Sequence, residues 1–218
     1  MQELLKEGLT VGFSAFVGAS PAFFRERFTA RLEKRRRDYS SLREAHFAIL
    51  QQYTALTSLR DQFLTAAVQS PVPWLTMLPI VGFFEAPRLD VPKLVYILES
   101  PEPDLLNRLL VAQQKYLALH AYFEQRNSVH GQFQERLASL QRDEKLASPA
   151  PPVDDIERLV GQPLVGRLKT LTDAILSTYP GIMVFQQAQL NDLEVFSRRV
   201  FPKRRAPKFE LLPEAQRK

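Results

Sequence analysis

The sequence contains no cysteine, and its 218 residues include only eight glycines, three histidines and one tryptophan. The absence of cysteine excludes disulfide bonds, thiolate-ligated metals, iron–sulfur clusters and a cysteine nucleophile. The scarcity of glycine argues against all-β sandwiches and dinucleotide-binding folds, whose turns need more of it. With histidine only at His46, His120 and His130, the commonest catalytic chemistries have few groups to work with.

Motifs that would bind a nucleotide or a metal are also missing. Neither a P-loop nor the glycine-rich dinucleotide fingerprint occurs. The Glu-x-x-His spacing of di-iron bundle enzymes precedes none of the histidines. His120 and His130 would lie about 15 Å apart along a helix, too far apart to share one ion. We therefore expect no enzymatic activity, no cofactor and no metal site.

Positive charge is concentrated in two segments, although the net charge is only +5. Between Arg25 and Arg43 eight basic residues accompany three acidic ones, and between Arg198 and Lys218 eight accompany two. The rest of the chain is mildly acidic. Such clusters bind anionic lipid, nucleic acid or acidic protein surfaces, and they also occur as solvated helix faces and chain ends.

An uncharged run, residues 8–24, directly precedes the first basic cluster. Its length is at the lower limit of about 17–20 residues for crossing a bilayer. A signal peptide would carry its positive charge before the run, whereas here the charge follows it. We therefore expect a membrane-anchor helix over residues 1–24, with a buried or interfacial helix of a soluble protein as the alternative. The positive-inside rule then places the rest of the chain in the cytoplasm.

Two sets of residues in this region are candidates for contact. Small residues recur four apart in the run, so Gly8, Gly12 and Gly18 are predicted to line a helix–helix contact in a homo-oligomer, unless they are simply typical of a weakly apolar segment. The predicted contacts with an anionic membrane surface, or with nucleic acid, are the basic residues that follow: Arg25, Arg27, Arg31, Lys34, Arg35, Arg36 and Arg37.

The remaining sequence has the three-and-four spacing of apolar residues that is typical of helices packed in a core. Helices are predicted over residues 25–69, 92–100, 101–146, 156–177 and 182–200, with a turn at 179–181. The first of these begins as a basic stalk, residues 25–41, ahead of a bundle formed by residues 42–201. The predicted fold class is all-α: an up-and-down bundle of about four long helices after the N-terminal hydrophobic helix.

Three further segments interrupt or follow the helices. Residues 71–92 hold five prolines and are predicted to form an ordered loop that either packs over the bundle or binds a partner. Residues 148–152 are a linker, and residues 202–218 are a basic tail. The predicted contacts with a protein partner come from this loop and from the start of the tail: Trp74, Phe83, Phe84, Arg198, Arg199, Lys203, Arg204 and Arg205.

The order of three segments carries a resemblance: the run 8–24, then RERFTARLEKRRRDY, then LREAHFAILQQYTALTSLRDQF. In layout alone it resembles bacterial proteins of unknown function that have one N-terminal membrane helix, an arginine-rich stalk and a cytoplasmic helical bundle. This resemblance implies the bacterial inner membrane as the location. We expect a non-catalytic, membrane-anchored interaction protein: a scaffold, a sensor or a membrane-acting effector. The alternative is a soluble helical protein that binds nucleic acid through residues 25–43 and 198–208.

Overall fold

The computed structural model describes residues 2–80, 87–143, 152–202 and 204, with side chains from residue 25 onward. Every regular element in these residues is a helix, so the predicted all-α class is confirmed. Three long helices dominate: α1 (Gln2–Leu59), α5 (Asp104–Arg142) and α7 (Gln162–Val200). Across the helices of this described part, no stretch combines the length and apolar character needed to cross a bilayer. The anchor over residues 1–24 stays a prediction.

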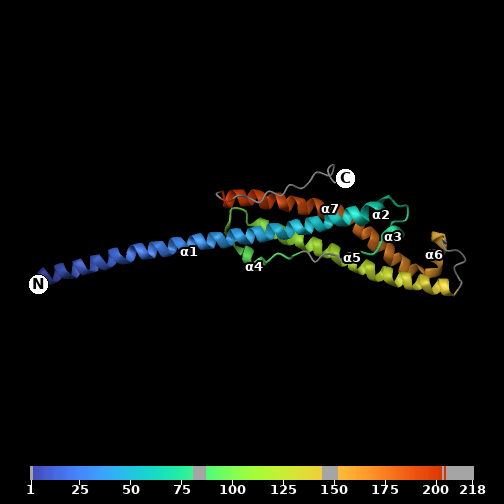
Figure 1. Ribbon diagram of the computed structural model, residues 1–218, viewed down its shortest axis with the longest axis horizontal. Coiled ribbons are helices and arrows are strands. Elements are labelled where there is room, and N and C mark those ends of the chain that lie inside the picture. Colours follow the sequence, from blue (N-terminus) through green and yellow to red (C-terminus); the bar gives the residue numbers. More distant parts are fainter. Residues whose placement is uncertain (1, 81–86, 144–151, 203, 205–218) are drawn as a thin grey trace.

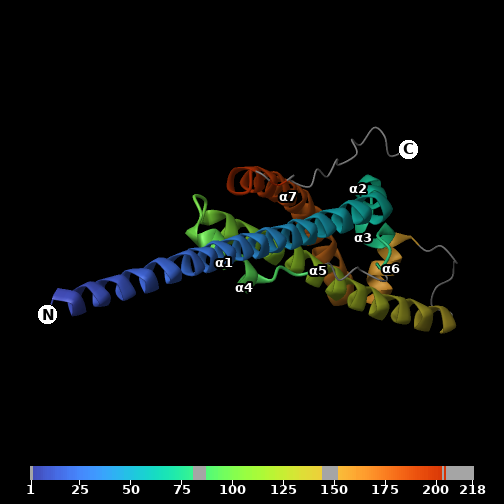
Figure 2. The same cartoon turned by 60° about the vertical axis from the view of Figure 1, so that its left-hand side comes forward.

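Helix α1 is continuous from the predicted anchor through the stalk into the bundle. Neither proline nor glycine occurs between Arg25 and Gln69, so nothing in the sequence interrupts it there. A π-helical turn (Arg60–Leu64) joins α1 to the short helix α2 (Thr65–Gln69). Figures 1 and 2 both show the N-terminal half of α1 projecting beyond the other helices. All side chains from residue 25 to residue 37 are exposed, and burial begins at Leu42.

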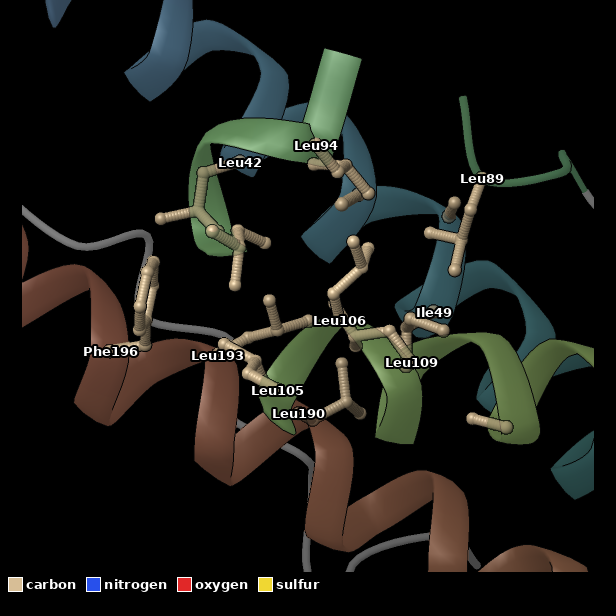
Figure 3. Packing of buried hydrophobic residues seen from close by; sticks show 14 of the residues in the cluster. Leu42, Ile49, Leu89, Leu94, Leu105, Leu106, Leu109, Leu190, Leu193 and Phe196 are labelled. Atoms are coloured by element: carbon tan, nitrogen blue, oxygen red, sulfur yellow. The ribbon is translucent and has the colours of Figure 1, made fainter. Parts of the chain in front are cut away.

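Helices α1 and α5 run in the same direction, and α7 runs opposite to both (Figure 1). The predicted up-and-down arrangement is therefore wrong. Three buried clusters follow one another along the bundle, and the first, near the stalk, is shown in Figure 3. Its members include Leu42, Ile49, Leu105, Leu109, Leu193 and Phe196. The middle cluster includes Leu56, Tyr116, Phe123 and Ile175, and the far cluster includes Trp74, Phe133, Val165 and Leu168.

The proline-rich segment causes this topology, because it returns along the bundle before α5 begins. It contains α3 (Pro73–Thr76) and leads into α4 (Val91–Leu94), which a 3₁₀ turn (Val95–Glu99) extends. Its described part packs on the bundle, with these side chains buried: Trp74, Met77, Ile80 and Leu89. Of the two predictions for this segment, packing over the bundle is therefore the correct one for these four residues. Phe83 and Phe84 lie outside the described part.

Side chains of the long helices form hydrogen bonds with the backbone of this proline-rich segment, residues 71–92, which is called the crossover segment below. Asn127 accepts a hydrogen bond from Ile80 N (3.1 Å) and donates one to Ile80 O (2.7 Å). Gln113 Oε1 accepts from the backbone N–H of Leu89, and Gln52 Nε2 donates to the carbonyl of Pro87 (3.3 Å). Irregular backbone lacks the internal partners of a helix, so these amides supply hydrogen bonds to backbone groups that no helix pairs.

A buried amide also joins the three long helices to one another. Gln186 Nε2 of α7 donates to Gln52 Oε1 of α1 (3.1 Å) and to the carbonyl of Ala112 in α5 (3.0 Å). Both glutamines are almost completely buried. Sliding any one helix by a turn would leave these polar groups unpaired in the core, so the network fixes the register of the bundle.

The predicted turn at residues 179–181 is wrong, because α7 continues through Pro180. Tyr179 and Ile182 are buried in the middle cluster, and the Tyr179 hydroxyl donates to the carbonyl of Leu56 (3.1 Å). Tertiary packing therefore outweighs the hydrogen bond that proline removes, and α7 bends along its length (Figure 1). The two predicted C-terminal helices are one helix, which leaves three long helices in the described part instead of about four.

The chain breaks earlier, between α6 (Val153–Val160) and α7. Gly161 has φ +107°, a conformation that side chains with a Cβ rarely adopt. This glycine ends α6 and allows α7 to begin just before Pro163, so the helix predicted over residues 156–177 is divided here. Of the predicted linker, residues 148–151 lie outside the described part.

Two buried histidines make the stability of this fold depend on pH. Burial lowers the pKa of His46, against the opposing effect of Glu194, and burial together with Arg126 lowers the pKa of His130. The unfolded chain therefore takes up these protons more readily, with the ordinary histidine pKa of 6.5. Stability is expected to be full above that pH and to fall as the pH drops below it.

The urea midpoint measured between about pH 7.5 and about pH 5 checks this expectation. Replacing both residues by glutamine (His46→Gln with His130→Gln) removes the two protonation sites, so the midpoint should then change less with pH. An equally steep fall in the double variant would assign the pH dependence to other groups.

Candidate functional site at the base of the stalk

The stalk is a positively charged helix surface that faces solvent. Its seven basic residues, from Arg25 to Arg37, are all exposed. Lys34 forms an ion pair with Glu99 of the bundle (3.3 Å), and both side chains are largely exposed, so the pair adds little stability. The stalk therefore presents a net positive charge to solvent.

The C-terminal end of α7 lies against the base of this stalk. Phe201, the residue after α7, is buried and meets Tyr39 of α1 edge-on, with ring centroids 5.3 Å apart. The Arg35 guanidinium lies over the Phe201 ring at 6.0 Å, and its Nη2 donates to the carbonyl of Val200 (3.0 Å). Because the last carbonyls of a helix lack partners within it, Arg35 caps α7.

This contact brings the two basic clusters of the sequence together in space. Arg204, beyond the end of α7, stacks over the Tyr39 ring at 5.6 Å, and its backbone N–H donates to the carbonyl of Phe201 (2.9 Å). The sequence analysis predicted each cluster separately and assigned no contact between them. Arg198 and Arg199 add little to this positive charge, because they form ion pairs with Glu194 and Glu102 respectively. Lys203 and Arg205 lie outside the described part.

A cavity of about 380 Å³ opens where the clusters meet. The described residues that line it are Leu32, Arg35, Arg36, Phe201 and Arg204, none of them acidic. Its three arginines form no ion pair with a carboxylate in the described part of the chain. Guanidinium groups gathered in this way offer charge-assisted hydrogen bonds to an anion, and none of the described lining residues is a nucleophile or a general base.

On another side of α1, a region of mixed charge is a weaker candidate. Two cavities of about 570 Å³ and 250 Å³ lie along α1 beside α4. Lys93 sits between them and pairs with Glu44 (3.2 Å) and Asp90 (3.1 Å). Burial raises the pKa of Asp38, while Lys34 and Arg37 oppose that rise. Because acids and bases balance each other here, this region has no clear preference for a charged ligand.

The remaining predicted contact residues fall into two groups. Trp74 is only 6% exposed and packs edge-on against Phe133 with ring centroids 5.8 Å apart, so its side chain belongs to the core and does not face a partner. The surroundings of Gly8, Gly12 and Gly18 lie outside the part whose side chains are described. Their helix–helix contact stays a prediction.

Sequence reasoning missed one residue of importance, Arg126, which is fully buried. Its Nε donates to Thr172 Oγ1 (2.9 Å), and its Nη2 donates to the carbonyls of Trp74 (3.1 Å) and Met77. Its Nη1 is buried without a hydrogen-bond partner in the described part, and burial lowers its pKa to about 10. The signal was its spacing: Arg126 follows Phe123 by three residues, which places it on the buried face of the helix.

No protein-family model, curated protein or solved structure matches this chain. Its function must therefore be argued from its own residues. The described features that offer chemistry to another molecule are the exposed basic stalk and the arginine-lined cavity at its base. Both suit the binding of an anionic partner.

Proposed function

We propose that this chain is a membrane-anchored helical-bundle protein that acts by interaction, as a scaffold, a sensor or a membrane-acting effector, and not by catalysis. The observation that carries the proposal is α1, one helix that joins the uncharged run 8–24 to the basic stalk and then to the bundle. Helices without tertiary packing are only marginally stable in water. The part of α1 outside the bundle therefore needs a partner.

A bilayer supplies that partner for both halves of the segment. Its hydrocarbon accepts the uncharged run, and its anionic headgroups attract the arginines that follow, each contributing about 1 kcal/mol near the surface. Since Arg204 lies beside the stalk, the end of the bundle nearest the membrane is positive while the rest of the chain is mildly acidic. This distribution favours binding at a cytoplasmic leaflet, as the positive-inside rule expects.

Nucleic-acid binding is the second candidate, and the meeting of the two clusters at one place favours it as well. A phosphate backbone would bind the same exposed arginines through electrostatics that are independent of sequence. The two candidates differ in what they require of residues 8–24, because only a membrane protein needs an apolar anchor.

Fractionation of cell membranes tests the proposal with the full chain and with a version lacking residues 1–24. Each membrane pellet is washed first with high salt and then with alkaline carbonate. The full chain is expected to resist both washes, because apolar contacts survive salt and high pH, whereas the truncated chain should be soluble.

A matched variant controls for charge in this experiment. Replacing Arg25 and Arg31 with glutamine leaves the run intact, so that variant should resist carbonate as the full chain does. Release of the full chain by salt alone would contradict the anchor. Nucleic-acid binding would then become the leading function.

A further inference from the structure

We propose that the cavity at the base of the stalk is a binding site for a phosphate group. Three guanidinium groups, those of Arg35, Arg36 and Arg204, line one volume of about 380 Å³. This volume falls in the range of about 300–1,000 Å³ that is usual for small-molecule sites. Planar guanidinium groups match the oxygens of phosphate with paired hydrogen bonds, which a scattered set of lysines would not do.

Two of the three arginines of this site, Arg35 and Arg204, are held in place before any ligand arrives. Arg35 is fixed by the carbonyl of Val200 and by the Phe201 ring, and Arg204 is fixed by the Tyr39 ring. A guanidinium that stacks on a ring through its face keeps its edge free to donate hydrogen bonds. Since these side chains have already lost much of their freedom, a ligand loses less entropy in ordering them.

Two sources of phosphate suit the cavity: a lipid headgroup and a free phosphate. A lipid is favoured by the exposed side chains of Phe28 (63%) and Leu32 (44%), which share one face of α1 with Arg35 and extend toward the uncharged run. The distance between the cavity and the end of the uncharged run argues against a lipid headgroup. Arg36 lies about 18 Å along the helix from Phe24, whereas a headgroup layer is about 5–8 Å thick. A lipid would thus reach the cavity only beside a strongly tilted α1, and this arm of the proposal rests on the proposed membrane anchoring.

Calorimetric titration of the full chain in an uncharged detergent tests the site. The probes are inorganic phosphate and a short-chain phosphatidic acid. The test variant combines Arg36→Gln with Arg204→Gln and leaves the helix cap by Arg35 untouched. The control combines Arg25→Gln with Arg31→Gln, which removes the same charge from the exposed stalk above the cavity.

The wild type is expected to bind phosphate, and the test variant to bind it at least about tenfold more weakly, since two charged hydrogen-bond donors are lost. The control should weaken binding by less than about threefold, through long-range charge alone. Phosphatidic acid binding about tenfold more tightly than inorganic phosphate would identify a lipid headgroup as the source, because the glycerol and acyl groups would then contribute contacts. Equal affinities would identify a free phosphate.

Two results would overturn the site: no binding of either probe by the wild type, or equal weakening in both double variants, which would mean diffuse attraction to the stalk. Circular dichroism spectra like those of the wild type establish that the variants fold. Failure here is distinct from failure of the proposed function. A chain that resists carbonate and binds no phosphate is anchored without this site, and a chain released by salt that binds phosphate has the site without the anchor.

Discussion

Replacing Arg126 with alanine is expected to lower the free energy of unfolding by about 2–4 kcal/mol. The change leaves a cavity and removes the donors to the carbonyls of Trp74 and Met77, each of which costs about 1–3 kcal/mol when buried and unpaired. Removing a buried charge without a carboxylate partner offsets part of this loss. We expect the loss of these hydrogen bonds to exceed the gain from removing the buried charge, because the bonds hold the crossover segment against α5. Urea unfolding followed by Trp74 fluorescence and by circular dichroism measures the change.

Two variants separate the causes of this effect. Arg136→Ala removes an exposed arginine from the same helix and should change stability by no more than about 0.5 kcal/mol. Arg126→Met keeps most of the volume and removes both the charge and the donors, so it should lie between alanine and the wild type. If methionine made the protein as stable as the wild type or more so, the hydrogen bonds of Arg126 would contribute nothing net.

Replacing Trp74 with alanine is expected to cost about 3–5 kcal/mol, the range for removing a large aromatic side chain from a core. Trp74 is buried between α5 and α7, where its ring meets Phe133 and lies 5.6 Å from Lys169 Nζ. A surface residue that contacts a partner would leave stability unchanged on truncation. The same urea experiment, followed by circular dichroism because this variant lacks the only tryptophan, distinguishes the two roles.

The chain offers a control in the same crossover segment. Leu78 is 65% exposed, so Leu78→Ala should change the free energy of unfolding by no more than about 0.5 kcal/mol. Trp74→Phe retains an aromatic ring and should lose clearly less than the alanine variant. Equal unfolding midpoints for Trp74→Ala and Leu78→Ala would show that the ring adds nothing to the core.

Periodicity predicted the helices well and their directions badly. Three-and-four spacing reports which residues of a helix face a core, but it carries no information about which way a neighbouring helix runs. The signal for the parallel pair was the length of the proline-rich segment 71–92 in the sequence. Extended chain covers about 3.3 Å per residue, so twenty residues are ample to return along a helix, whereas a direct turn between antiparallel helices needs far fewer.

Proline and glycine residues led to a wrong prediction where tertiary packing outweighed their tendency to end a helix. Pro180 followed by Gly181 is a strong turn signal, yet both lie inside α7 because the residues on either side fill the middle cluster. Gly161 did end a helix, since its positive φ suits no other residue so well. The candidate site follows the same rule. Composition revealed both basic clusters, but the side-chain contacts that join them at the end of α7 are established only by the folded chain.

The place of α7 in the bundle has a consequence for biosynthesis. Both α1 and α5 pack mainly against α7, the last helix in the described part of the chain. Leu42 and Leu190 belong to the same buried cluster but are separated by roughly 150 residues of sequence. Leu190 is therefore synthesised about 7–30 s after Leu42, at a translation rate of about 5–20 residues per second. During that interval the apolar stripe of α1 has left the ribosome without its partner. A nascent chain stopped before α7 would thus expose the surfaces of both earlier helices to chaperones and proteases. Under the proposed anchoring, residues 8–24 would reach a bilayer before the bundle folds.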